Sequence, residues 1–157
     1  MVKLPLGFLA LSLTASVGLA AEMTVMTPDA TKWGPAPSVF AKGMEFAVIY
    51  GDPYASGEYV VREKLPAGYA FPAHFHPGTE NFTVISGTFH IGMGDKLDKK
   101  HAQTLEAGAF LSMPAKMHHY AWASSDTVIQ LHGVGPLALT YVNPADDPRL
   151  EQPHDNR

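Results

Sequence analysis

Residues 68–87 read GYAFPAHFHPGTENFTVISG and carry the most informative pattern in the chain. His74 and His76 are two positions apart, so on a β-strand both imidazole rings project from the same face. Glu80 keeps the same parity, and the Pro-Gly pair before it lets the backbone bend so that the carboxylate can return to the rings. Two imidazoles and a carboxylate are typical ligands of a divalent transition metal ion. The stretch therefore predicts a metal site.

From about residue 44 onward, the chain consists of short apolar or alternating runs separated by turn residues. No run has helical periodicity over a useful length, so the pattern predicts an all-β fold. Gly87, between the runs 84–86 and 88–91, is expected to form the turn of a β-hairpin. About ten short strands fit a double-sheet jelly-roll barrel, and the predicted runs are 46–50, 58–65, 70–76, 80–85, 88–92, 103–106, 109–113, 119–124, 127–132 and 137–142.

The histidine stretch also resembles a known family, because its spacing G-x5-H-x-H-x3-E-x6-G matches the first motif of the cupin superfamily at every fixed position. The second cupin motif, G-x5-P-x-G-x2-H-x3-N, aligns with residues 108–123 and keeps its Gly, Pro and His. Lys116 replaces the family's second Gly, and Ala123 replaces its Asn. The resemblance implies a cupin barrel (a double-stranded β-helix) over residues 44–142, with His74, His76, Glu80 and His119 as metal ligands.

The second motif offers two neighbouring candidates for the fourth ligand, His118 and His119. If His119 faces the barrel interior, strand parity turns Ala121 and Ala123 inward as well, which leaves room for a substrate. An inward His118 would bring two large aromatic side chains into the pocket instead. Parity and family register both favour His119. The metal is predicted to be Fe, Mn, Ni or Zn, since ligand softness does not select among them.

The first twenty residues resemble a secretory signal peptide. A short positive head ending in Lys3 precedes an apolar run over residues 4–19, and the small residues at its end favour cleavage before Ala21. A membrane anchor is the alternative, but the run is broken by Pro, Gly, Ser and Thr and is followed by an acidic residue. We therefore expect a periplasmic or secreted protein without stable membrane insertion after processing.

Composition restricts the class of protein further. The net charge is −4, and it becomes −5 once Lys3 is removed, with 10 basic and 15 acidic residues left. No basic stripe is present, which argues against nucleic acid as a partner. The chain has no cysteine, so no disulfide framework exists. We predict one barrel domain over residues 44–142, preceded by an extended arm over 21–43 that Trp33 and Phe40 anchor and followed by a tail over 143–157.

The resemblance to cupins leaves the activity open, because that superfamily contains enzymes of several kinds and proteins that are not enzymes. The leading hypothesis is a metal-dependent, dioxygenase-like oxidoreductase acting on a small molecule, with Glu80 also serving as the catalytic base. The alternatives are a redox-neutral isomerase or lyase acting on a sugar acid or hydroxy-carbonyl compound, and a non-enzymatic binding or sensor module. The resemblance also hints at a homodimer. The expected pocket walls are Tyr69, Phe75, Phe82, Trp122 and Gln130.

Overall fold

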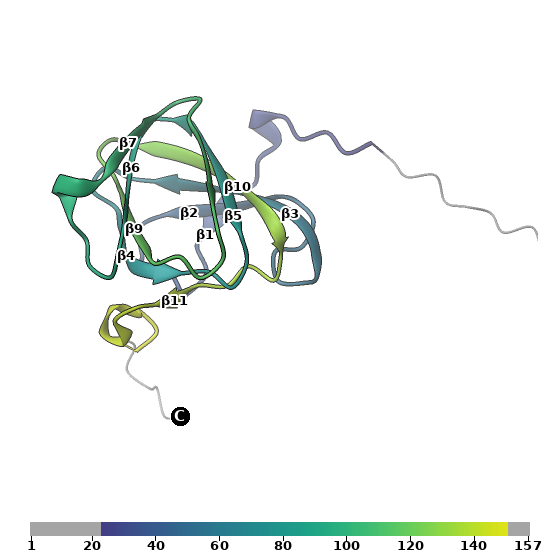
Figure 1. Ribbon diagram of the computed structural model, residues 1–157. Helices are drawn as coiled ribbons and strands as arrows, with labels where there is room; N and C mark the ends of the chain where they lie inside the picture. The colour runs from purple at the N-terminus through teal and green to yellow at the C-terminus, as the bar shows by residue number, and fades with distance from the viewer. Residues whose placement is uncertain (1–22, 151–157) are drawn as a thin grey trace, which may run out of the picture.

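The computed structural model describes residues 23–150, which form two antiparallel β-sheets that pack against each other as a jelly roll (Figure 1). This confirms the predicted all-β cupin fold. The expected signal peptide lies outside the described residues, as does the end of the C-terminal tail. Within residues 23–150, no helix is long and apolar enough to cross a membrane.

Each sheet collects strands that are far apart in the sequence. The larger sheet has the order β1-β2-β3-β10-β5-β8 and the smaller one the order β11-β4-β9-β6-β7. The strands are β1 (Gly34–Pro35), β2 (Glu45–Tyr50), β3 (Gly57–Leu65), β4 (Ala70–Phe75), β5 (Glu80–Ser86), β6 (Thr88–Met93), β7 (Gln103–Glu106), β8 (Phe110–Met113), β9 (His119–Ala123), β10 (Thr127–Gly135) and β11 (Thr140–Tyr141). Three single 3-10 turns complete the described part of the chain: Pro28–Ala30, Lys99–His101 and Pro144–Asp146.

The core lies between the sheets and follows from the alternation along each strand. In β3, Tyr59, Val61 and Leu65 are buried, while Arg62 and Lys64 between them are not. Aromatic residues from both sheets meet in this core, including an edge-to-face contact between Phe82 and Phe89 with ring centroids 5.3 Å apart. The barrel interior is therefore a packed apolar layer, and any polar group placed in it stands out.

The predicted hairpin at Gly87 is wrong. β5 pairs with β10 and β8 in the larger sheet, whereas β6 pairs with β9 and β7 in the smaller one. Gly87 (φ +82°) is thus a corner at which the chain passes from one sheet to the other. A Cβ atom there would lie 2.3 Å from the carbonyl oxygen of Asp126, so the corner requires glycine for conformation and for space.

Smaller differences concern the two ends of the barrel. The run 137–142 was expected to be a full strand, but only Thr140–Tyr141 pairs there, while β10 continues to Gly135. In the arm, the short strand Gly34–Pro35 pairs with β2. Phe40 is buried in the core, and the ammonium group of Lys64 lies 5.6 Å from the centroid of a Trp33 ring. The arm therefore packs on the larger sheet and sends one aromatic ring inside.

Candidate metal centre

The first two histidines come from the end of β4 and the residues after it. The pairing of β4 with β9 shifts register between Phe71 and His74, which marks a bulge at Pro72 and Ala73. The bulge lets Phe71 and His74, three residues apart, both line the barrel cavity. His76 follows two positions later and faces the same cavity, as the period of two predicts.

His119 begins β9, and its neighbours decide which way it faces. Ala121 and Ala123 belong to the core between the sheets, whereas Tyr120 and Trp122 pack in a separate cluster on the other side of the strand. His119 has the same parity as the two alanines and lines the cavity. His118 lies outside, where its Nδ1 is 2.6 Å from Oδ1 of Asp95. The structure therefore places His119 inside, as parity predicts.

Backbone carbonyl groups orient all three inner rings. Nδ1 of His74 lies 2.7 Å from the carbonyl oxygen of Pro72, Nδ1 of His76 lies 2.8 Å from that of Ala138, and Nδ1 of His119 lies 2.9 Å from that of Met117. A carbonyl oxygen only accepts hydrogen bonds, so each Nδ1 carries the proton. Each Nε2 therefore keeps its lone pair, which is the arrangement of metal-binding histidines.

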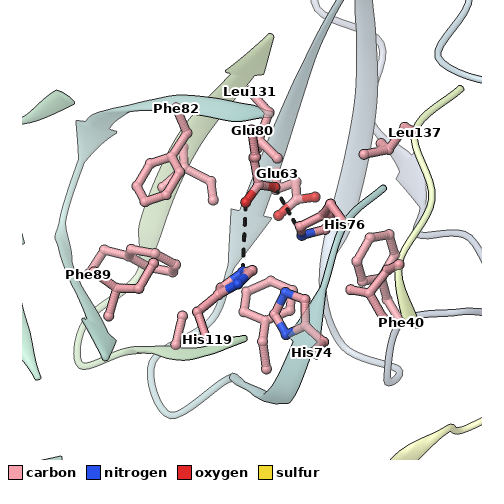
Figure 2. A pocket seen from close by; sticks show the side chains of 15 residues that line it. Phe40, Glu63, His74, His76, Glu80, Phe82, Phe89, His119, Leu131 and Leu137 are labelled. Carbon is pink, nitrogen blue, oxygen red and sulfur yellow. Dashed lines mark ion pairs between the residues drawn. The ribbon is translucent and has the colours of Figure 1, made fainter. Parts of the chain in front are cut away.

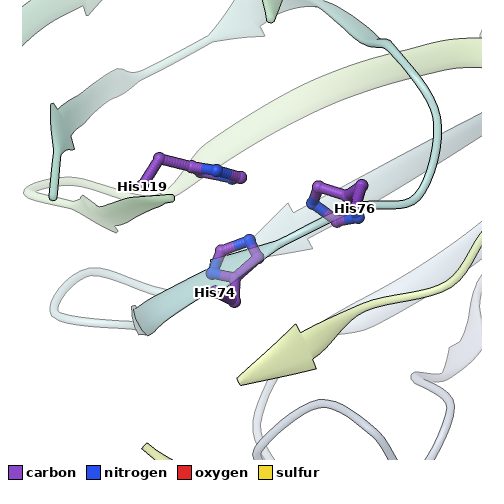
Figure 3. Close-up of side chains that lie close together, drawn as sticks. All are labelled: His74, His76 and His119. Atoms are coloured by element: carbon purple, nitrogen blue, oxygen red, sulfur yellow. The ribbon is translucent and has the colours of Figure 1, made fainter. Parts of the chain in front are cut away.

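The free nitrogens converge on one point (Figure 3). One ring nitrogen from each of His74, His76 and His119 lies within 4.8 Å of the other two. Nε2 of His76 is buried and has no hydrogen-bond partner. Oε1 of Glu80 is 3.4 Å away, but that contact does not have the geometry of a hydrogen bond. A buried nitrogen without a partner is costly. The donor set therefore fits a bound metal ion, which would satisfy this nitrogen.

Glu80 approaches the histidines from the other sheet, as the first residue of β5. Figure 2 shows its carboxylate between His76 and His119, and its Oε2 lies 3.7 Å from Nε2 of His119. Burial raises the pKa of Glu80 above its usual value, and His76 opposes this shift. The carboxylate thus contacts two of the three rings and can serve as a fourth ligand or as a proton acceptor.

Two of the histidine rings, those of His74 and His119, are held neutral. Burial, together with His119 and His76, holds the pKa of His74 well below its usual value. Burial is also the main reason that the pKa of His119 falls to about 4. Neutral imidazole is the form that binds a metal, so near neutral pH these two rings bind an ion without first losing a proton.

The cavity around these residues is small and mostly apolar. The centres of water-sized groups can move over about 30 Å³ of it. Of the expected wall residues only Phe82 lines it. Phe75, Trp122 and Gln130 do not, because strand parity turns them outward. Tyr69 lies in the core but outside this lining, packed against Phe71 with ring centroids 5.1 Å apart. The apolar lining comes instead from Phe40, Phe71, Phe82, Phe89, Ile91, Ala121, Ile129, Leu131, Leu137 and Leu139.

Sequence reasoning missed a second acidic residue in this cavity. Glu63, in the middle of β3, is 2% exposed and lines the cavity close to Glu80 (Figure 2). Burial, and to a smaller extent the charge of Glu80, raises the pKa of Glu63 to about 8. The signal was the alternation along β3, since Tyr59, Val61 and Leu65 share its parity and are buried.

The turn before β9 keeps its shape although Lys116 replaces the family's glycine. Lys116 has φ +63°, a left-handed conformation that glycine adopts more easily. Its backbone N–H donates to the carbonyl oxygen of His76 at 2.8 Å. This bond ties the turn that leads into His119 to the histidines that follow β4.

Comparison with known proteins agrees with this fold. The model of a family described as the ChrR cupin-like domain matches residues 21–138. No curated protein matches the sequence.

Several solved structures share the fold. A candidate acetylacetone dioxygenase from Methylibium petroleiphilum PM1 is 20% identical with a TM-score of 0.63, over 85% of this chain and 90% of that one. An acetylacetone dioxygenase from Acinetobacter johnsonii is 15% identical with a TM-score of 0.61, over 87% and 88% of the two chains. The Rhodobacter sphaeroides complex of SigE with the anti-sigma ChrR contains a chain that is 18% identical with a TM-score of 0.51, over 68% of this chain and 51% of that one. Similarity at these identities shows a common fold.

Proposed function

Because the chain belongs to the ChrR cupin-like domain family, we propose that it is a metal-dependent oxidoreductase of the dioxygenase kind that acts on a small molecule. The observation that carries the proposal is the buried trio of His74, His76 and His119. Their free nitrogens converge, and one of them, Nε2 of His76, has no hydrogen-bond partner. Together with Glu80 they would hold one divalent ion of Fe, Mn, Ni or Zn. Four protein ligands would leave open positions on a six-coordinate ion.

In this proposal the ion and the residues around it have separate roles. When bound, an ion such as Fe(II) supplies Lewis acidity toward a substrate oxygen and electrons toward O2. The three histidines fix its position through their backbone hydrogen bonds. Glu80 would take the substrate proton on a carboxylate oxygen that is no longer bound to the ion. The phenylalanine-rich walls exclude water from the reaction.

The choice of dioxygenase chemistry is supported by the structural relatives that carry the name acetylacetone dioxygenase. Both have the cupin fold. A β-diketone such as acetylacetone is also a small molecule, and a narrow cavity accepts only small molecules. Acetylacetone is therefore the first compound to test, as a representative of small dicarbonyl compounds.

A binding or sensor module is the second candidate. The matching family is described by its likeness to ChrR, and ChrR itself is named as an anti-sigma protein in complex with SigE. In such a module the same ion would present a ligand-binding face without turnover. Oxygen consumption separates this candidate from the first.

Export is part of the proposal as well, supported by the leader-like residues 1–20. Cell fractionation with N-terminal sequencing tests it, and a mature chain that begins at Ala21 in the periplasm is the expected result. The homodimer remains a prediction, which light scattering of the purified protein checks.

The decisive experiment combines elemental analysis with oxygen uptake. Purified protein should contain one equivalent of Fe, Mn, Ni or Zn, and His74→Ala should contain none. Oxygen uptake is then measured with acetylacetone, catechols and flavonols. Uptake that disappears with the metal supports a dioxygenase, while a full metal site without uptake favours a redox-neutral or binding role. A wild-type protein that takes up no metal contradicts the ligand assignment.

A further inference from the structure

Glu63 is the one acidic group of the cavity that the proposed metal chemistry does not use. Its neighbours on β3 have partners outside the barrel. Nε of Arg62 donates to Gln130 at 2.9 Å, and Nζ of Lys64 lies 2.9 Å from Glu45. Within residues 23–150, no lysine or arginine pairs with Glu63 and no hydrogen bond to its carboxyl group is present. The alternation of side chains along β3 therefore places the carboxyl group of Glu63 inside the barrel, where no group in the described residues pairs with it.

The strands on both sides of Glu63 surround it with apolar groups. In the sheet it lies opposite Phe46 of β2 and Ile129 of β10, and both are buried. Its carboxyl group instead faces the cavity that it shares with the histidines. A buried carboxyl group without a partner destabilises a folded protein, so packing gives no reason for an acid here. A ligand in the cavity would supply the missing partner.

We propose that Glu63 is a substrate-binding residue, whose carboxyl group hydrogen-bonds the O–H or N–H of a small substrate while a neighbouring oxygen of that substrate faces His74, His76 and His119. This inference rests on the proposed function and names its substrate class. The substrate carries an oxygen that can face the ion and, two to four bonds from it, a hydrogen-bond donor, as in the enol of a β-diketone, an α-hydroxy-carbonyl compound or a hydroxamate. Because the surrounding walls are apolar, a charged or extended molecule would find no further polar partner like Glu63 in them.

The test compares two small probes on metal-loaded protein by calorimetry. Acetohydroxamate has both a metal-directed oxygen and an N–H or O–H donor, whereas azide binds metals but donates no hydrogen bond. Glu63→Leu is expected to weaken acetohydroxamate about tenfold to a hundredfold, because the hydrogen-bond donor of the bound probe is left without a partner in an apolar cavity. Azide affinity should change by less than about threefold, since it uses no such bond.

Two further variants sharpen the result. Glu63→Gln keeps a hydrogen-bonding side chain of similar size and should recover part of the lost acetohydroxamate affinity. Glu58→Gln changes an exposed residue on the same strand and should change nothing. Equal loss for both probes, or no loss for either, overturns the proposal.

A second measurement needs neither metal nor substrate, so it separates this proposal from the proposed function. If Glu63 is kept for a ligand, Glu63→Gln should raise the melting temperature of metal-free protein at pH 8, because the amide cannot ionise and so avoids the cost of an unpaired buried charge. A lower melting temperature would show a structural role and overturn the inference. A wild-type protein that binds no metal would refute the dioxygenase proposal, and the melting result would still decide the role of Glu63.

Discussion

The two faces of the smaller sheet carry histidines of different kinds. On the inner face, His74 and His119 are 4% and 3% exposed, and their Nδ1 atoms donate to backbone carbonyl groups. On the outer face, His90 and His118 stack on aromatic rings and bond to polar side chains. Both kinds have an oriented ring. Only the inner ones bring their free nitrogens together in a cavity with little room for water, and this convergence distinguishes a candidate metal centre from ordinary surface histidines.

The sharpest test of this difference uses two adjacent residues. His119→Ala should reduce metal affinity by at least about a hundredfold, because a direct ligand is lost and even supporting residues contribute 10–100-fold. His118→Ala should leave metal content unchanged, since its ring lies on the outer face beside Asp95. Elemental analysis of both purified variants gives the answer. Equal metal content in the two variants would erase the distinction between the faces.

A substitution at Glu80 tests whether metal binding and turnover need a carboxylate as well as the inner histidines. Glu80→Gln keeps the size of the side chain but removes its charge, so metal should bind more weakly than in wild type yet better than in His74→Ala. Oxygen uptake with an accepted substrate should fall about 10²–10⁴-fold, the usual contribution of a general base. Turnover close to wild type in the metal-loaded variant would leave Glu80 without a catalytic role.

The burial of Glu63 predicts that the stability of the folded protein falls as the pH rises, an effect that exposed carboxylates do not cause. The folded-state pKa of this residue is raised to about 8 from its usual value of 4.5, so the proton is bound more tightly in the folded state. The stability that this proton provides is complete below pH 4.5 and is lost as the pH rises through about 8.

The corresponding measurement is denaturant unfolding of metal-free protein. Wild type should lose about 3 kcal/mol relative to Glu63→Gln between pH 5 and 8. The inner histidines contribute equally to both proteins, so the difference isolates Glu63. Parallel pH profiles for the two proteins would contradict the raised pKa.

The smallest expected effect concerns the turn that sets which histidine of the adjacent pair faces inward. Lys116→Gly should relieve the left-handed strain, worth about 1–2 kcal/mol, and lose about 0.4–1 kcal/mol through the greater freedom of the unfolded chain. A net gain of about 0.5 kcal/mol in unfolding free energy is expected. Ala115→Gly, beside it in the turn, should destabilise instead. A loss of stability in Lys116→Gly would mean that the lysine side chain itself supports the turn.

Much of the fold and the inner histidines could be predicted because they depend on local periodicity. The spacing of two between His74 and His76, and the small residues that share the parity of His119, indicate how the rings project without knowledge of the tertiary structure. The hairpin at Gly87 failed because a single glycine between two apolar runs is equally compatible with a hairpin and with a corner between sheets. Long-range pairing decides between these, and it is not encoded in the turn.

The missed acid and the wrong wall residues have related causes. Glu63 lies between Arg62 and Lys64, so composition suggests a solvated face, and only the parity of the flanking Tyr59 and Val61 reveals its burial. Phe75 was expected to face the pocket, yet its ring stacks on His118 at a centroid distance of 5.0 Å. The alternation that turns His74 and His76 inward turns Phe75 outward, so parity indicates its position just as it indicates the burial of Glu63.

The origin of the proposed ligands has a mechanical consequence. The histidines belong to the smaller sheet and its adjoining residues, whereas Glu80 begins a strand of the larger one. An ion held by all four would join the two layers, as a disulfide does in many β-sandwiches, in a chain that has no cysteine. Loading and removal of the metal would then control how easily the layers separate, and resistance to proteolysis would follow the supply of metal.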